Sequence, residues 1–276
     1  MRTLQTKSIF ALPFAILLFA AHGVSAQNRT VDATMQPDAQ LLLRLANQAR
    51  AAAGAGPLEW DPALATAARK HCLRMAAAGN ISHRYADEQD LSERAGSAGA
   101  HFSLVEENVA SAWDAEAIHD AWMHSPGHRT NLLNPEVNRV GIALVAGRNT
   151  LYAVADYSRA VEVRTQEQIE ATVARNLQAH GMTILSDPTG ARAACELDHG
   201  LPRSLSGPQP RFVFRWQQAD LDHLPQQLVD TLASGEYKQA SVGSCAPQNV
   251  NGAFTTYRVA VLLYGLPSAD QIRSFD

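Results

Sequence analysis

The sequence predicts an α+β protein in which helices layer on a small antiparallel sheet. Three observations lead to this class. Two amphipathic helical patterns occur near the N-terminus, two alternating strands joined by a turn follow near the middle, and further helical patterns lie beyond them. Helices with one apolar stripe and strands with one apolar face bury those surfaces against each other, which produces layers.

The first 26 residues are typical of a secretory signal peptide. Arg2 and Lys7 make a basic start, residues 9–21 form an apolar run, and Val24-Ser25-Ala26 fits cleavage before Gln27. The run is too short to favour a permanent membrane span, and no later stretch is apolar enough for one. We therefore expect residues 1–26 to be removed and the soluble remainder to be secreted or periplasmic, without stable membrane insertion.

The charge of the mature chain argues against two classes of partner. The whole sequence has 23 basic and 27 acidic residues, and the leader holds two of the basic ones, so the mature chain has 21 against 27 and a net charge near −6. A nucleic-acid partner would require a basic patch. Adhesion to anionic lipids would also favour a basic surface. The remaining length of about 250 residues allows one large or two modest domains.

Two helices open the mature chain. The first is expected over residues 38–53 with Gly54 as its end, and the second begins at the N-cap Asp61 and runs to Gly79. His71 lies in the apolar stripe of the second helix, so we expect a packed core histidine rather than a ligand. Cys72 lies between apolar positions of the same helix and is expected to be a buried thiol.

The middle of the chain contains a third helix and a hairpin. Residues 80–112 are turn-rich with little clear periodicity, so no element is predicted there. Asp114 caps a helix that buries Trp122, and the Pro126-Gly127 turn that follows presents His128 just beyond it. Residues 139–145 and 151–157 alternate as two strands, and residues 146–149 join them as a hairpin.

Three side chains are candidates for chemistry. His83, Glu107 and His128 each lie in a non-repetitive segment, and two imidazoles with a carboxylate are the material of a metal site or an acid–base site. A serine hydrolase of the nucleophile-elbow type is not indicated, because no Gly-x-Ser-x-Gly occurs.

A series of short motifs runs in a fixed order between residues 38 and 158. They are Asn47-Gln-Ala-Arg50, Gly56-Pro-Leu-Glu-Trp60-Asp-Pro62, Leu64, Ala67-Ala68, Ile81-Ser-His83, Glu93-Arg94, Ala95-Gly96, Glu107-Asn-Val109, Trp122, Ser125-Pro-Gly-His128-Arg, Asn131-Leu-Leu and Val140-Gly-Ile142. Together they resemble the CAP superfamily, also known for its SCP domain, which groups cysteine-rich secretory proteins, antigen 5 and plant pathogenesis-related proteins. The bacterial branch is the most similar.

The resemblance implies a three-layer α-β-α sandwich with a cleft over residues 38–160. In many members two histidines and two acids line the cleft, and some members bind zinc there. His83 and His128 match the two histidines and become the candidate metal ligands, with zinc as the cofactor. Glu107 matches one acid and joins them as a catalytic candidate. The second acid would fall at Ser125, so Glu93 and Asp156 remain as candidates for it.

The resemblance leaves three functions open. The first is an exported protein whose His/Glu cleft binds a small ligand, with a divalent metal as one means of holding it. The second is a hydrolase acting on envelope peptides or glycans, with Glu107 and one histidine as an acid–base pair. The third is a non-catalytic extracellular interaction module. The partner expected in each case is a small molecule, a lipid or an envelope component.

Residues 165–276 are expected to form a smaller C-terminal α+β domain that repeats the first in degenerate form. Asp187-Pro188 echoes Asp61-Pro62, Val242-Gly243 echoes Val140-Gly141, and the later echoes are closer together by about two dozen residues. The copy is therefore expected to lack the stretch that carries His83 and Glu107. An unrelated small α+β domain is an equally weighted alternative.

Three cysteines in an oxidising compartment predict one disulfide and one leftover thiol. Cys195 and Cys245 are the expected pair because both lie in the second half. A disulfide between Cys72 and either of them is the competing interpretation.

Overall fold

The computed structural model describes residues 35–203, 205, 207–248 and 253–265. They form two α+β subdomains, each built on a four-stranded sheet. The predicted signal peptide, residues 1–26, lies outside the described residues. Within the described part, none of the helices is long and apolar enough to cross a membrane.

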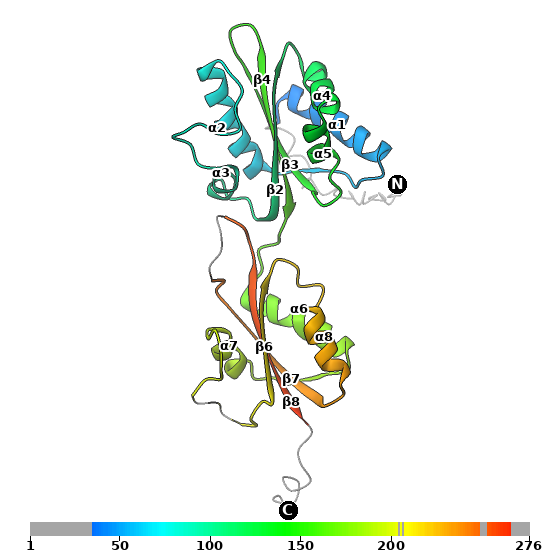
Figure 1. Ribbon diagram of the computed structural model, residues 1–276, viewed down its shortest axis with the longest axis vertical. Coiled ribbons are helices and arrows are strands. Elements are labelled where there is room, and N and C mark those ends of the chain that lie inside the picture. Colours follow the sequence, from blue (N-terminus) through cyan, green and yellow to red (C-terminus); the bar gives the residue numbers. More distant parts are fainter. Residues whose placement is uncertain (1–34, 204, 206, 249–252, 266–276) are drawn as a thin grey trace, which may run out of the picture. The chain divides into compact units, whose positions relative to one another are not determined.

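The first subdomain is a three-layer α-β-α sandwich. Its sheet has the order β1-β3-β4-β2, in which β1 pairs parallel with β3 and the other pairs are antiparallel. Figure 1 shows α2 and α3 on one face of this sheet and α1, α4 and α5 on the other. The predicted fold class is confirmed. The elements are α1 (Pro37–Ala52), β1 (Glu59–Trp60), α2 (Pro62–Ala78), α3 (Leu91–Ser97), β2 (Phe102–Ala112), α4 (Ala115–His124), α5 (Pro126–Leu133), β3 (Arg139–Ala146) and β4 (Leu151–Ala160).

Local chemistry explains how α2 begins and why it packs so closely on the sheet. The Asp61 side chain accepts hydrogen bonds from the first backbone amides, and Pro62 occupies the first helical position. The helix crosses β3 at Gly141, where an added Cβ would lie 2.0 Å from the backbone nitrogen of Ala65. Only glycine therefore allows this approach. It brings α2 directly onto the strands that carry part of the site.

Two predictions for the middle of the chain are corrected by the structure. Residues 102–112 form the long strand β2, although their sequence shows little periodicity, because residues 107–110 are all buried and show no alternation. His128 lies in the first turn of α5 rather than just beyond a free turn. Pro126 starts that helix, since the first helical position needs no backbone N–H.

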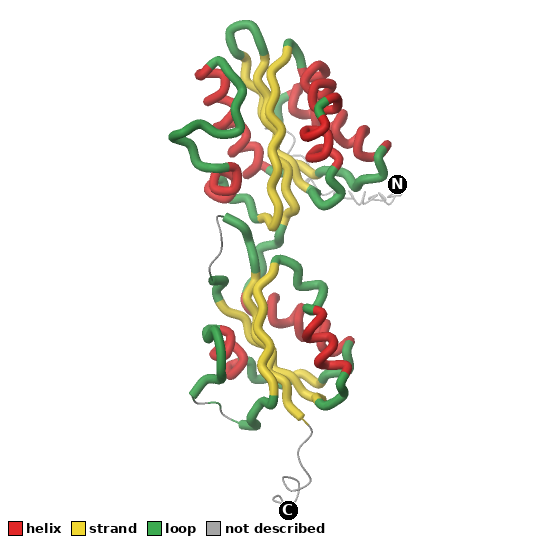
Figure 2. The backbone as a smooth tube through the Cα atoms, in the orientation of Figure 1, coloured by secondary structure: helices red, strands yellow, loops and turns green. Residues whose placement is uncertain are grey.

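The second subdomain has the same sheet topology. Its order is β5-β7-β8-β6, again with one parallel pair of two residues followed by two antiparallel pairs. In Figure 2, α7 lies on one face of the sheet, and α6 and α8 lie on the other. Gly243 meets α7 as Gly141 meets α2, with an added Cβ 2.1 Å from the nitrogen of Arg192. The elements are α6 (Gln166–Ala179), β5 (Thr183–Ile184), α7 (Thr189–Cys195), β6 (Phe212–Gln218), α8 (Gln226–Ala233), β7 (Tyr237–Cys245) and β8 (Tyr257–Gly265).

The shared topology supports the degenerate repeat, but the segment that the repeat lacks differs from the one expected. In the first sheet Gly141, Asp156 and Glu107 lie side by side across three strands. The corresponding row in the second sheet is Gly243, Ala260 and Arg215. The expectation that the Glu107 stretch is missing is therefore wrong, because β6 is retained. No helix corresponding to α5 occurs between Ala233 and Tyr237, so the described residues there contain no counterpart of His128.

The predicted disulfide is present. Cys195 and Cys245 are bonded, with their Cα atoms 5.8 Å apart, and they join α7 to the end of β7. The alternative pairings with Cys72 are excluded. Cys72 is a buried thiol whose Sγ donates to the carbonyl of Tyr152, and burial raises its pKa to about 12.

Candidate functional site

The predicted residues His83, Glu107 and His128 come together at the outer edge of β2, and we call them the edge site. The rings of His83 and His128 lie 6.3 Å apart between centroids. His83 belongs to the loop between α2 and α3 on one face of the sheet, and His128 belongs to α5 on the other. Side chains that belong to layers on opposite faces of a sheet are separated by the thickness of that sheet, about 10 Å or more. The rings therefore meet around the open edge.

The Glu-Asn dipeptide of β2 organises both histidine segments. Successive strand residues point to opposite faces. Glu107 accepts a hydrogen bond from Nδ1 of His83 at 2.9 Å, while Asn108 donates from Nδ2 to the backbone carbonyl of His128 at 2.9 Å. Asn131 of α5 donates to the carbonyl of Glu107 and to Oδ1 of Asn108. One dipeptide thus fixes a side chain on one face and a helix on the other.

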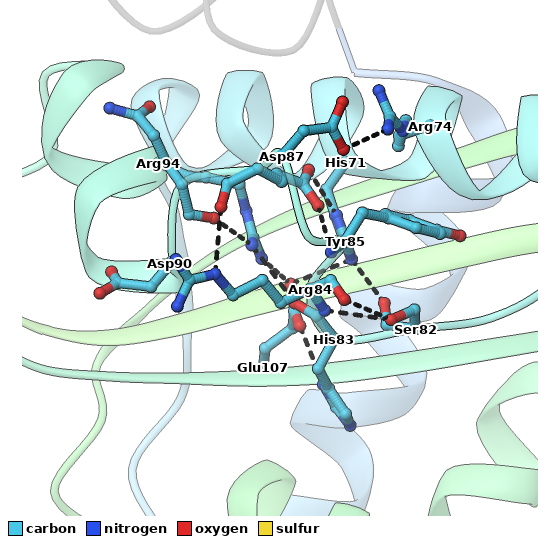
Figure 3. Close-up of polar contacts among 12 residues, drawn as sticks. His71, Arg74, Ser82, His83, Arg84, Tyr85, Asp87, Asp90, Arg94 and Glu107 are labelled. Atoms are coloured by element: carbon cyan, nitrogen blue, oxygen red, sulfur yellow. Dashed lines mark hydrogen bonds and ion pairs between the residues drawn. The ribbon is translucent and has the colours of Figure 1, made fainter.

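Arg94 forms an ion pair with the Glu107 carboxylate. Its Nη2 pairs with Oε2 of Glu107, and its Nη1 donates to the backbone carbonyls of His83 and Gln89 at 3.3 and 3.2 Å. Figure 3 shows Arg94 and His83 converging on Glu107 from α3 and from the preceding loop. Glu107 therefore carries a neutralising partner, and the histidine loop is tied to it at the backbone as well as the ring.

His71 anchors the start of the same loop. The ring is fully buried, as predicted for a core histidine. Its Nδ1 lies 2.8 Å from Glu88 Oε1 and its Nε2 lies 2.7 Å from the carbonyl oxygen of Ser82, the residue before His83. Both ring nitrogens of His71 therefore face oxygen atoms of the loop that carries His83. Sequence reasoning missed this connection, because Glu88 and Ser82 meet His71 only through the loop's folding.

The two histidines of the edge site have opposite electrostatic surroundings. The hydrogen bond to Glu107 raises the pKa of His83, against a smaller opposing effect of burial. Burial lowers the pKa of His128, and the neighbouring His83 lowers it further. His83 therefore takes up a proton more readily than His128. The His83 side chain is 61% exposed, whereas the Glu107 side chain that accepts its hydrogen bond is 3% exposed.

The structure decides which acid lies next to Glu107. Ser125 sits at the junction of α4 and α5 and provides no carboxylate. Glu93 is engaged in a capping box with Asp90 at the start of α3. Asp156 lies directly opposite Glu107 in the β2–β4 pair and is completely buried. Burial, followed by the charge of Glu107, raises the pKa of Asp156 well above its ordinary value.

The site offers two metal-ligating side chains. No cluster of three or more His, Cys, Asp or Glu side chains suited to a metal occurs in the described residues, so His119 and His124 do not complete a set with His128. Two imidazoles that share a zinc ion place their centroids about 5–6 Å apart. The observed 6.3 Å fits after a small rotation of the exposed His83 ring. Because Glu107 occupies Nδ1, Nε2 is the nitrogen of the His83 ring that could ligate a metal.

Fold and site together define a class: an α-β-α sandwich domain with a carboxylate-held histidine pair at the edge of its sheet. The model of the Cysteine-rich secretory protein family, CAP, matches residues 43–157. The resemblance to the CAP family that the motifs predict is confirmed over this segment of the chain.

The chain is similar to known proteins in sequence and in structure. The uncharacterized protein YkwD of Bacillus subtilis is 31% identical over 108 residues, which are 38% of this chain and 41% of YkwD. The match thus spans less than half of that relative. An outer surface protein of Borrelia burgdorferi is 21% identical, with TM-score 0.42, over 45% of this chain and 92% of its own. An extracellular SCP-domain protein of Bacillus anthracis is 27% identical, with TM-score 0.40, over 45% and 44%.

Proposed function

We propose that the edge site binds a small ligand through a divalent metal ion held by His83 and His128. One observation carries this proposal: Glu107 accepts from Nδ1 of His83, so Nε2 of an exposed ring is left free beside His128. Histidine ligands of metals in proteins usually have their second nitrogen held by a carboxylate or a carbonyl in this way.

The ion would leave coordination positions open for the ligand. With two protein ligands its affinity would be modest, and it would supply a Lewis acid for an oxygen donor. Such a donor can belong to a small molecule, a lipid or an envelope component. The chain's own residues hold the site in shape: Arg94 and Glu107 fix the His83 ring, and Asn108 fixes the start of α5.

Zinc titration by calorimetry tests the metal site. The mature protein is expected to bind about one equivalent, and the His83→Ala/His128→Ala double variant none. Glu107→Gln is expected to weaken binding by about 10–100-fold, because the ring loses its anchor. His180→Ala removes an exposed histidine elsewhere, whose Nδ1 bonds to the Asn176 carbonyl, and should change nothing. Equal zinc binding by the double variant and the intact protein would contradict the proposal.

We also propose that the protein is exported. The leader pattern of residues 1–26 and the disulfide between Cys195 and Cys245 support this, since disulfides persist in oxidising compartments. Mass spectrometry of the protein isolated from its own cells is expected to find a mature N-terminus at Gln27. An intact Met1 together with free thiols at both cysteines would overturn this location.

A further inference from the structure

Asp156 is a carboxyl group whose surroundings do not suit a charge. It lies in the middle of β4, completely buried, between Glu107 on β2 and Gly141 on β3. Among the described residues, neither of its oxygens receives a hydrogen bond. A buried carboxylate without donors is costly, and such a group holds its proton instead.

The ionisable groups packed around Asp156 contact Glu107 rather than Asp156. From α3, the guanidinium of Arg94 is paired with Oε2 of Glu107. From α2, Nε2 of His71 lies 3.9 Å from that same oxygen. From β2 itself comes the Glu107 carboxylate, and from β3 only Gly141, which carries no charge. Arg94 and His71 thus both approach Glu107, and Asp156 lies opposite the Glu107 carboxylate in the β2–β4 pair.

A proton on Asp156 would remove the repulsion between the two neighbouring carboxylates. Two ionised carboxylates side by side can only accept, and like charges that close disfavour ionisation of both. A neutral Asp156 gains an O–H group, and Glu107 is the acceptor beside it. Both the burial of Asp156 and the negative charge of Glu107 raise the pKa of Asp156, while Arg94 opposes them with a smaller effect.

We propose that Asp156 is the second acid of the edge site, a neutral carboxyl that donates a hydrogen bond to Glu107 and so positions the carboxylate that holds His83. It is a positioning residue, because it lies behind Glu107 and cannot reach a ligand. This inference rests on the proposed function in one respect only, namely the metal ion that His83 is proposed to bind. The proton on Asp156 and its effect on Glu107 stand independently of any metal.

Infrared spectroscopy near neutral pH tests the proton. Protein with isotope-labelled aspartate is compared with unlabelled protein and with the Asp156→Asn variant, all free of metal. The intact protein is expected to show a carbonyl band of a protonated carboxyl that shifts with the label and is missing from the variant. If the intact protein has no such band, Asp156 is ionised and the proposal falls. This result does not depend on zinc binding.

The positioning role is tested by nuclear magnetic resonance of the His83 ring. In the intact protein neutral His83 is expected as the Nδ1–H tautomer, because Glu107 accepts from that nitrogen. Asp156→Asn retains an N–H donor toward Glu107 and should preserve the tautomer. Asp156→Ala removes the donor and should shift His83 toward the Nε2–H form, with Asp156→Leu as a second variant if the alanine fails to fold. Retention of the tautomer in the alanine or leucine variant would refute the role.

Discussion

The rings of His83 and His128 lie 6.3 Å apart between centroids, yet the two histidines are predicted to titrate in a defined order. Glu107 raises the pKa of His83, whereas burial and the nearby His83 lower that of His128. Following both rings by nuclear magnetic resonance across the range around their ordinary value should show His83 losing its proton at the higher pH. Glu107→Gln should move the pKa of His83 downward. A higher pKa for His128 than for His83 would contradict this account.

The same order sets the pH dependence of metal binding. A proton on Nε2 of His83 competes with the metal, and a raised pKa means that this competition begins at a higher pH as acid is added. Zinc affinity is therefore expected to fall as the pH is lowered through neutrality, before His128 is protonated. Calorimetry at several pH values measures it. Affinity that rises on acidification would exclude His83 as a ligand.

Cys72 is expected to be inert in the folded protein. Burial raises its pKa to about 12, so almost no thiolate is present at neutral pH, and the side chain is enclosed. A thiol reagent should label it slowly in the native protein and fully after denaturation, with the denatured Cys195→Ser/Cys245→Ser variant as a measure of the Cys72 thiol alone. Rapid labelling of the native protein would show that α2 opens readily.

At the scale of elements, the sequence predicts what depends on local chemistry. The N-cap Asp61 with Pro62 fixes the start of α2, and the strands of the hairpin begin where their alternation begins. Strand β2 escapes prediction because its centre is covered on both faces, so its apolar and polar residues follow no period. The hairpin strands β3 and β4 are buried almost as continuously, and the turn of residues 146–149 between them is what makes them predictable.

The candidate site follows the same division. The motifs around His83, Glu107 and His128 are visible in the sequence. The supporting contacts are not, since Arg94 reaches Glu107 across thirteen positions and His71 reaches Ser82 across eleven, through a loop without a pattern. The choice between Glu93 and Asp156 depends on strand register, which places Asp156 opposite Glu107. Register is a property of the assembled sheet.

The two strand glycines provide a test of how α2 and α7 pack. An added Cβ at Gly141 or Gly243 would lie about 2 Å from helix backbone, so Gly141→Ala and Gly243→Ala should each lower the free energy of unfolding by about 3 kcal/mol. Gly56→Ala is the matched control, because nothing lies within 4 Å of its added Cβ. Its cost should stay within about 0.5 kcal/mol in denaturant unfolding. Equal effects at all three positions would refute the close approach.

At the scale of the whole molecule, one topology carries two different sets of residues. The row of Gly141, Asp156 and Glu107 in the first sheet is replaced by Gly243, Ala260 and Arg215 in the second. The glycine that admits the helix is kept, because the layers need it. The carboxyl pair is not kept, because the sheet does not need it. The proposed chemistry therefore belongs to the first subdomain, and the fold alone does not specify it.

The helix α7 of the second subdomain is shorter than α2, so we expect this subdomain to depend more on its disulfide for stability. The bond closes a loop with a sequence separation of 50 residues, for which chain entropy gives a stabilisation of about 4 kcal/mol. In the Cys195→Ser/Cys245→Ser variant, amides of α7 and β7 should lose about that much protection in hydrogen exchange. Amides of α2 and β3 serve as the internal control and should keep theirs. Unchanged protection in α7 and β7 would mean that packing at Gly243 suffices to hold this helix on its sheet.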